Sequence, residues 1–315
     1  LTVMNLVRAP DDGPVAGQLT NTYPTQPQQS WSLAVDEVLP GGSFLWPDSL
    51  PATYGTAQFI DLGSTLVTTV GTGPGQQRGI VAVDAATGQV KWNTSTDGAI
   101  TCATGEIDHT LPCVVRNRDT AQSTVQFFDL DTGEVESTID RPSASMVEVS
   151  DGSIFTVDSY QGGYTFSRGT QRNLDAQWMT SQSWDSDCIG SGDAHYFDIS
   201  DGIVHFTSVR AFALSSDDGR LLSDPNLGGF VRLPGQGFAG GICEMPPSED
   251  GSTTSVVDRS GAERFRIERS YPADPWLVSA SEDRPFVGSL GAYSIEAGAP
   301  LRTVEGAEYF WLKKV

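Results

Sequence analysis

The sequence predicts an all-β fold assembled from repeated small antiparallel sheets, and three observations predict it. A segment made of an apolar strand, a turn rich in Asp, Ser and Gly, and a second strand recurs along the chain. Its residues alternate between apolar and polar and favour β-branched and aromatic types, as at Ile80, Val125 and Phe127. No stretch of 12 residues keeps helical apolar spacing without an interrupting Gly or Pro. The pattern therefore argues against a helical solenoid.

The spacing of the copies predicts the size of each sheet. The turn glycines Gly88, Gly133, Gly219, Gly261 and Gly298 follow one another at intervals of 45, 86, 42 and 37 residues, and 86 is two units of 43. A period of about 40–50 residues that holds four short strands is typical of a β-propeller blade. The copies are Gly79–Thr94, Val125–Ile139, a degenerate one at Tyr164–Met179, Ala211–Ser223, Thr254–Ile267 and Gly291–Val304.

The blades can be placed in order along the chain. Two pieces remain outside the complete blades, a Trp-containing strand at 29–35 and an apolar strand at 307–315. Propellers close their ring by building one blade from both termini, which removes exposed sheet edges. We therefore expect seven blades, the last a composite, with six or eight as alternatives. The complete blades are expected at 36–95, 96–142, 143–182, 183–226, 227–269 and 270–305.

The first copy of the repeat carries the most specific pattern, A-x-D-x-x-T-G-x-x-x-W. Asp84 and Thr87 can hydrogen-bond the turn backbone, and Gly88 supplies the positive φ that a tight turn needs. Trp92 is expected to pack flat against the next blade, and Ala82 completes the pattern. The pattern resembles the repeat of the pyrroloquinoline-quinone (PQQ) type β-propellers over roughly Trp31 to Val304.

The pattern weakens in later copies. Ser137 stands at the Trp position of the second copy, and Trp178 is the candidate Trp of the third. Elsewhere only the turn and an apolar outer strand remain.

Composition limits the classes of partner. Lys and Arg number 19 against 40 Asp and Glu, so the net charge is −21 and the pI is about 4.3. Nucleic-acid binding requires a basic surface, and docking on anionic lipid headgroups does too. We therefore expect neither nucleic-acid binding nor docking on anionic lipid headgroups. We also expect the propeller to be a monomer.

The four cysteines indicate an oxidising compartment. Cys102 and Cys188 each lie 31 residues before a turn glycine, whereas Cys113 and Cys243 lie 20 and 18 residues before theirs. Of the three connectivities, this repeat geometry favours Cys102–Cys113 across a hairpin and Cys188–Cys243 between adjacent blades. Zinc is not expected, because the chain has no C-x-x-C pair and its three histidines show no ligand spacing. Paired cysteines place the protein outside the cytoplasm, with reduced core thiols as the alternative.

The N-terminal residues predict a tether. Residues 1–28 are expected to form an extended membrane-proximal linker, because residues 9–30 are rich in Pro, Gln, Gly, Thr and Asn without apolar periodicity. Residues 29–315 are expected to form a single propeller domain. We expect an anchor to precede Leu1; a plain secreted protein is the alternative.

Catalysis is not expected. Quinoprotein enzymes hold their cofactor with a disulfide between adjacent cysteines, a Trp platform and a carboxylate-bound metal. No two cysteines are adjacent here, and no position matches that shell. We therefore predict no cofactor and no catalytic residue. A quinoprotein-like oxidoreductase, a carbohydrate-active enzyme or another channel ligand stays open as the alternative, since acids of different blades can meet on a propeller axis.

An acidic cluster leaves calcium open as an alternative ligand. Carboxylates can bind Ca²⁺, but these spacings do not follow the twelve-residue loop pattern, and Asp-Gly and Ser-Gly pairs also suit β-turns. The cluster comprises Asp185, Asp187, Asp193, Asp198 and Asp201.

Two loops are the candidate interaction surfaces. The insertion Leu39–Tyr54 carries Phe44, Leu45 and Trp46, and the segment Gly228–Phe238 carries Phe230, Arg232 and Phe238. Exposed aromatic groups would serve as anchors for a partner, unless they fold back over the blades. The sequence therefore predicts a non-enzymatic, extracytoplasmic propeller, similar to the scaffold propeller of outer-membrane assembly and to actinobacterial envelope propellers. It would bind an envelope or membrane protein as a scaffold or sensing module.

Overall fold

The structure is a computed structural model, and all its regular structure in the described residues is β-strand apart from one short 3-10 helix, η1 (Val35–Glu37). The predicted tether, the closing strand 307–315, Trp46, Cys188, Cys243, Asp185, Asp187 and Asp193 lie outside the described residues. The described residues are 31–45, 59–72, 77–96, 98–183, 196–208, 210–223, 227–233, 235, 237–242, 253–267, 286–288, 291–293 and 300–303.

Within these ranges the strands form six antiparallel sheets, which we number as blades 1 to 6. Blade 1 contains β1 (Ser43–Leu45), β2 (Ile60–Asp61), β3 (Thr65–Gly71), β4 (Gln77–Asp84) and β5 (Val90–Ser95). Blade 2 contains β6 (Gly98–Cys102), β7 (Thr110–Asn117), β8 (Ser123–Asp129) and β9 (Val135–Asp140). Blade 3 contains β10 (Ala144–Ser150), β11 (Ser153–Tyr160), β12 (Gly163–Thr170) and β13 (Asn173–Ser183).

The remaining blades follow in chain order. Blade 4 contains β14 (Tyr196–Ser200), β15 (Ile203–Thr207) and β16 (Ala211–Ser215). Blade 5 contains β17 (Leu227–Leu233), β18 (Gly237–Ile242), β19 (Thr253–Val257) and β20 (Glu263–Ile267). Blade 6 contains β21 (Phe286–Gly288), β22 (Gly291–Tyr293) and β23 (Pro300–Thr303).

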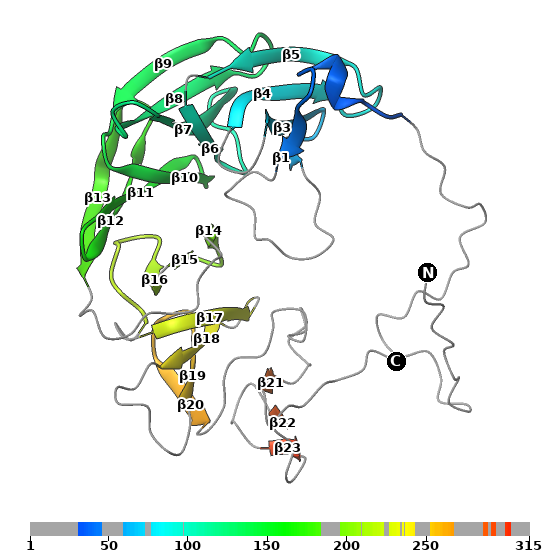
Figure 1. The fold of residues 1–315 in the computed structure, drawn as a ribbon. Coiled ribbons are helices and arrows are strands. Elements are labelled where there is room, and N and C mark those ends of the chain that lie inside the picture. The colour runs from blue at the N-terminus through cyan, green and yellow to red at the C-terminus, as the bar shows by residue number, and fades with distance from the viewer. Residues whose placement is uncertain are drawn as a thin grey trace, which may run out of the picture.

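The arrangement of the sheets is that of a β-propeller. The sheets follow one another around an arc, with β6, β10 and β14 toward its inside and β9 and β13 at its rim (Figure 1). Consecutive strands pair antiparallel within each blade, except that β1 and β2 of blade 1 both pair with β3. The predicted fold class is therefore confirmed, and each predicted complete blade contains one described sheet. The composite seventh blade is not tested, although the strand predicted at 29–35 is not formed over residues 31–34.

The core lies between blades, where the faces of neighbouring sheets meet. The contact of blades 3 and 4 is an aromatic cluster in which Tyr164 lies 4.5 Å from Phe206 and Phe166 lies 5.3 Å from Phe206 between ring centroids. Both pairs have the edge-to-face geometry that aromatic rings favour. Buried Phe155, Phe197 and Phe212 join the same cluster.

The innermost strand of blade 1 differs from the prediction. β1 pairs with one half of β3 and β2 with the other half, so two short strands together form the innermost strand, and the first of them lies within the predicted insertion. Phe44 and Leu45 therefore lie in β1 rather than in an open loop. Phe44 is half-buried with its ring centroid 6.1 Å from that of Phe59, because the strand packs on the blade.

Candidate functional site

The residues of the repeat motif form a turn whose polar atoms are satisfied locally. Asp84 Oδ1 accepts hydrogen bonds from the backbone N–H of Ala86 and Thr87 and from the Thr87 hydroxyl at 2.8–3.1 Å. The hydrogen bond from the Thr87 side chain is the main cause that lowers the pKa of Asp84. Gly88 has φ of 71°, a conformation that L side chains rarely adopt. Ala82 is fully buried in β4 beside this turn.

The Trp of one blade packs on the turn glycine of the next. A Cβ placed on Gly133 would lie 2.5 Å from Trp92 Cε3, so only glycine allows the ring to lie on this turn. The Trp92 Nε1–H donates to Leu130 O at 2.8 Å. Trp31 makes the same pair of contacts with Gly88 and Ala85 O, and Trp178 makes them with Gly219 and Ser216 O. These motif residues therefore connect blades and leave no open ligand site.

Charged groups on the inner strands are engaged with one another. The Arg232 guanidinium in β17 donates to Asp198 Oδ2 at 2.6 Å and to Ser200 Oγ at 2.8 Å, which joins blade 5 to blade 4. Asp201 accepts a hydrogen bond from Gly235 N at 2.8 Å across the same junction. Asp198 and Asp201 thus stabilise a blade contact.

Glu148 is a buried carboxylate at the junction of blades 2 and 3. It is 2% exposed, and its oxygens accept hydrogen bonds from the backbone N–H of Thr104 and Val149 at 2.9–3.1 Å. Burial raises the pKa of Glu148 to about 7, against the effect of these hydrogen bonds. Sequence reasoning missed Glu148, and its only signal is a charged residue in the otherwise apolar run Met146–Val149.

A buried histidine and a partly buried tyrosine lie beside the Asp198–Arg232 ion pair. His205 directly opposes Asp198 in the pairing of β14 and β15, and burial lowers the pKa of His205 to about 4. The imidazole is therefore neutral near pH 7. Burial also raises the pKa of Tyr196 well above its usual value. Among the described residues, no group of three or more His, Cys, Asp or Glu could hold a metal ion.

The second predicted interaction loop is largely a β-hairpin. Phe238 is fully buried in β18 opposite Val257, so its prediction as an exposed anchor is wrong. Strand alternation turns this side chain into the core. Phe230 lies in β17, and Arg232 is half-exposed in its ion pair with Asp198.

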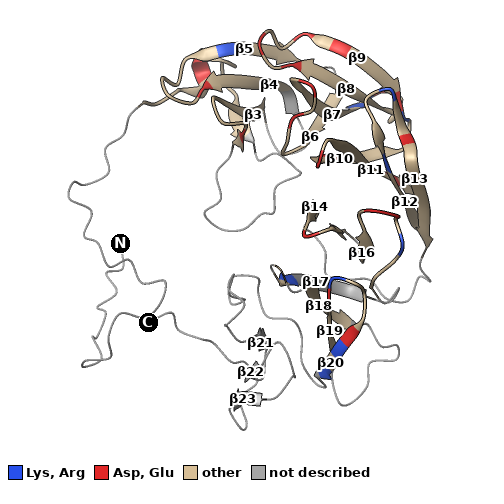
Figure 2. Cartoon of the chain, turned by 180° about the vertical axis from the view of Figure 1, so that it is seen from behind, with Lys and Arg blue, Asp and Glu red and all other residues tan. Residues whose placement is uncertain are grey.

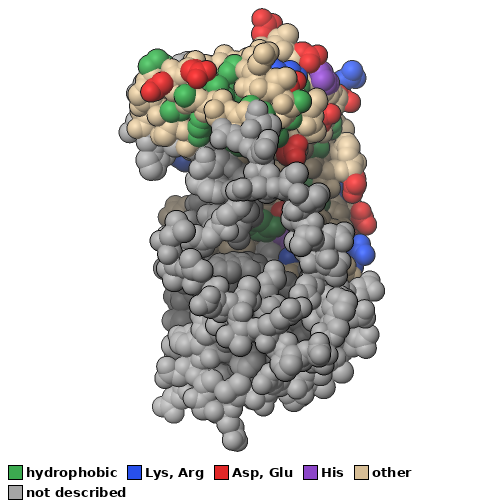
Figure 3. All heavy atoms as spheres, turned by 90° about the vertical axis from the view of Figure 1, so that its right-hand side faces the viewer, with side chains coloured by type: hydrophobic (Ala, Val, Ile, Leu, Met, Phe, Trp, Pro, Cys, Tyr) green, Lys and Arg blue, Asp and Glu red, His purple; other side chains and the backbone are tan. Residues whose placement is uncertain are grey.

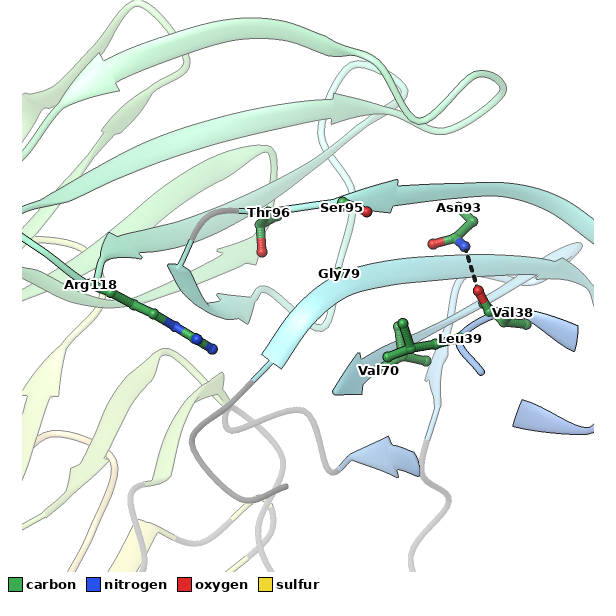
Figure 4. A pocket seen from close by; sticks show the side chains of 8 residues that line it. All are labelled: Val38, Leu39, Val70, Gly79, Asn93, Ser95, Thr96 and Arg118. Atoms are coloured by element: carbon green, nitrogen blue, oxygen red, sulfur yellow. Dashed lines mark hydrogen bonds between the residues drawn. The ribbon is translucent and has the colours of Figure 1, made fainter. Parts of the chain in front are cut away.

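A pocket of about 420 Å³ opens beside blade 1. The Asn93 Nδ2 donates to Val38 O at 3.1 Å along one side, and Arg118 reaches in from the β7–β8 turn (Figure 4). The described lining residues include one cation and no carboxylate, so they provide no acid–base pair. They are Val38, Leu39, Val70, Gly79, Asn93, Ser95, Thr96 and Arg118.

The outermost strands differ in the side chains they expose. We compare the two residues that flank the position equivalent to Trp92 in each outermost strand. The charged residues at these positions are Lys91 in blade 1, Glu136 in blade 2, and Arg264 and Arg266 in blade 5. In blade 3 they carry Gln177 and Met179. Figure 2 shows this contrast as charged colours on β5, β9 and β20 and an uncharged β13 along most of its length. In the view of Figure 3, Asp and Glu side chains are scattered over the described part of the surface.

Two large apolar side chains are exposed on blade 3. Met179 is 60% exposed and Tyr160 is 43% exposed. Met179 pairs with Ser167, while Tyr160 pairs with Gly163 and Gly163 with Ser183. Because side chains alternate along a strand, Met179 and Tyr160 project from the same face of the sheet. This is the candidate interaction surface, and sequence reasoning did not select it.

The cysteine prediction is confirmed for one pair. Cys102 and Cys113 form a disulfide between directly paired residues of β6 and β7. Among the described residues no helix is long and apolar enough to cross a membrane.

Comparisons with known proteins give fold-level likenesses only. No family model and no curated protein sequence matches the chain. The solved structures with a similar shape include BamB from Moraxella catarrhalis, 12% identical, covering 72% of this chain and 89% of that one with a TM-score of 0.34. Another is Hsv2 from Kluyveromyces marxianus, also 12% identical, covering 66% and 60% with a TM-score of 0.38. A third, the computationally designed protein Ika8, is 12% identical, covering 85% and 76% with a TM-score of 0.42. The fold assignment rests on this chain's own strand order and packing.

Proposed function

We propose that this protein is a non-catalytic β-propeller of the cell envelope that docks a protein partner on its outer surface. It resembles the PQQ-type propellers in its repeat and lacks their cofactor shell. On this proposal it works outside the cytoplasm as a scaffold or sensing module, held near a membrane by the segment before residue 29.

The observation that carries the proposal is the outer surface of blade 3. Met179 of β13 and Tyr160 of β11 are exposed on the same face of blade 3, and β13 carries no charge from Gln177 to Ser183. Among the described residues, the other exposed large apolar side chains, Val90 and Val135, stand directly beside the charged Lys91 and Glu136. Exposed apolar groups of this kind mark protein interaction sites more often than catalytic ones.

The charged groups inside the ring support the same proposal. Glu148, Asp198 and Arg232 are each engaged in short hydrogen bonds across blade junctions. Their roles are accounted for by blade packing. The disulfide of blade 2 supports an oxidising compartment, because such bonds persist outside the reducing cytoplasm.

Site-specific photocrosslinking tests the proposal in the native membrane setting. A photoreactive amino acid replaces Met179 in the full-length protein, and a matched variant carries it at Thr138, which is also exposed and lies one residue after the Trp position of blade 2. We expect one discrete protein adduct from position 179 and none from 138. Equal labelling at both positions, or none at either, would reject docking on blade 3.

The compartment is tested separately by thiol titration of the purified native protein. We expect no reactive thiol from Cys102 or Cys113. Reduction should destabilise blade 2, since removing a native disulfide typically costs about 2–5 kcal/mol. A freely titrating pair in protein isolated under alkylating conditions would contradict the extracytoplasmic proposal.

A further inference from the structure

We infer that the partner binds as an added β-strand along the outer edge of β13, through an extended segment with an uncharged centre and basic flanks. This inference rests on the proposed docking function and specifies its chemistry. Strand addition supplies affinity through main-chain hydrogen bonds, and side chains at alternate positions supply specificity.

The edge of β13 has the length that such pairing needs. β13 is the last strand in the order β10-β11-β12-β13, so one side of its backbone has no neighbouring strand in the described sheet. It extends over 11 residues, of which the stretch from Trp178 to Ser183 pairs with β12 in regular register, whereas β5 and β9 have 6 residues and β20 has 5. A long edge presents a continuous row of backbone donors and acceptors to another chain.

Within the described part of the chain, the edge of β13 also lacks the usual protection against pairing. Proteins protect edge strands with charged side chains, Pro or bulges that twist the edge away. Charged side chains stand on β5 at Lys91, on β9 at Glu136 and Asp140, and on β20 at three positions. From Ala176 to Ser183 β13 has no charge and no Pro, and its register with β12 is regular from Trp178 to Ser183.

The edge is held in place before any partner arrives. The Trp178 Nε1–H donates to Ser216 O of the next blade at 3.0 Å. The hydroxyls of Thr165 and Ser181 are 2.9 Å apart, and Tyr160 Oη donates to Gln182 O at 3.3 Å. A rigid edge loses little conformational entropy on binding, which favours affinity.

The charge around the edge selects the partner. The neighbouring outer strand β9 carries Glu136 and Asp140 and no basic residue, and the whole chain has a net charge of −21, although one exposed basic residue, Arg172, directly precedes β13. Lys or Arg residues flanking the added segment would be attracted to this surface, while its centre would meet uncharged side chains. A second copy of this chain would bring like charges together, so we commit to a separate basic partner.

The test uses a defined probe. A fluorescent peptide with a centre of alternating Thr and Val and two Lys at each end is titrated into the full-length protein, beside a peptide with Glu at the ends. Binding is measured by fluorescence polarisation, and amide hydrogen exchange identifies the strand that becomes protected. We expect the Lys-ended peptide to bind at least tenfold more tightly and to protect the amides of β13.

Two substitutions at one exposed position separate strand addition from simple charge attraction. Met179→Lys and Met179→Glu should both weaken binding of the Lys-ended peptide at least tenfold, because a charge of either sign interrupts the uncharged edge. The matched control Thr138→Lys in β9 should leave binding within twofold. Tighter binding by Met179→Glu, unchanged binding by both variants, or protection of another strand would overturn the inference.

The outcomes also separate this inference from the proposed function. A protein adduct at position 179 without protection of β13 amides would leave docking in place and reject strand addition. A concentration-dependent dimer that Met179→Lys abolishes would show that a second copy occupies the edge, and would overturn the commitment to a basic partner.

Discussion

The junction of blades 1 and 2 and the junction of blades 2 and 3 solve one packing problem with different chemistry. At the first, the Trp92 ring lies on Gly133 and its N–H donates to Leu130 O. At the second, Ser137 stands in place of the Trp and accepts a hydrogen bond from Gln171 Nε2 at 3.1 Å. A propeller blade can therefore be attached by one large apolar side chain or by a set of polar contacts.

The second junction adds buried charged groups, whereas the ion pair described across the first joins Lys91 to an exposed Asp131. Arg141, in the connection from blade 2 to blade 3, donates to Asp158 and Asp175 at 2.6–3.0 Å and to Ser167 Oγ at 3.2 Å. Glu148 of blade 3 accepts from the Thr104 N–H of blade 2. We infer that pH and charge substitutions act mainly on the second junction and volume changes mainly on the first.

Trp92→Ala should have the largest effect. Removing a buried Trp costs about 3–5 kcal/mol, because burial is lost and a cavity remains. Ser137→Ala, the matched change at the second junction, should cost less than about 1 kcal/mol. Denaturant unfolding of both variants measures the difference. Equal losses would show that the two junctions do not differ as described.

Arg141→Met should rank second. The Arg141 and Asp158 side chains are largely buried, and removing one member of a buried pair leaves the other charge without compensation. We expect a loss of about 2–4 kcal/mol, only partly recovered by Arg141→Lys, which keeps the charge but not the fork-shaped contact. A loss below about 1 kcal/mol for Arg141→Met would contradict this account.

Glu148 makes the second junction pH-dependent. Its pKa is raised to about 7 in the folded protein from an ordinary value of 4.5, so the folded state binds more protons between these values. Its contribution to the free energy of unfolding therefore falls as pH rises from about 4.5 to about 7, by at most about 3 kcal/mol.

Another buried group acts in the opposite direction over part of this range. The pKa of His205 is lowered to about 4, so its contribution rises with pH from about 4 to about 6.5. The difference between the wild type and Glu148→Gln isolates the carboxylate. We expect denaturant unfolding of Glu148→Gln to lose the decline between pH 4.5 and 7. Parallel pH profiles for the two proteins would reject the assignment.

The smallest expected effect compares two turns of blade 2. Asn117 Oδ1 accepts from the N–H groups of Asp119 and Thr120, as Asp129 does in the turn that ends at Gly133. Ala121, with φ of 57°, stands where that turn has glycine. Ala121→Gly should stabilise the protein by up to about 1 kcal/mol by relieving the left-handed conformation. A lower melting temperature for the variant would contradict this.

Much of the fold could be predicted from sequence because its determinants are local. The turn at Asp84–Gly88 satisfies its own polar atoms within five residues, and the period of the turn glycines sets the blade length. The Cys102–Cys113 pair follows from two paired strands of one hairpin. Each of these features involves residues close together in sequence, so spacing and residue type were sufficient.

The site depended on contacts that cross blades. Phe238 and Met179 are both apolar residues within strands, yet one is fully buried and the other 60% exposed. Only the packing of neighbouring sheets decides which face of a strand is covered. The sequence by itself thus determined an acidic, all-β propeller with a disulfide in blade 2. The tertiary structure decided which blade edge is uncharged and exposed, because that depends on residues of different blades brought together around the ring.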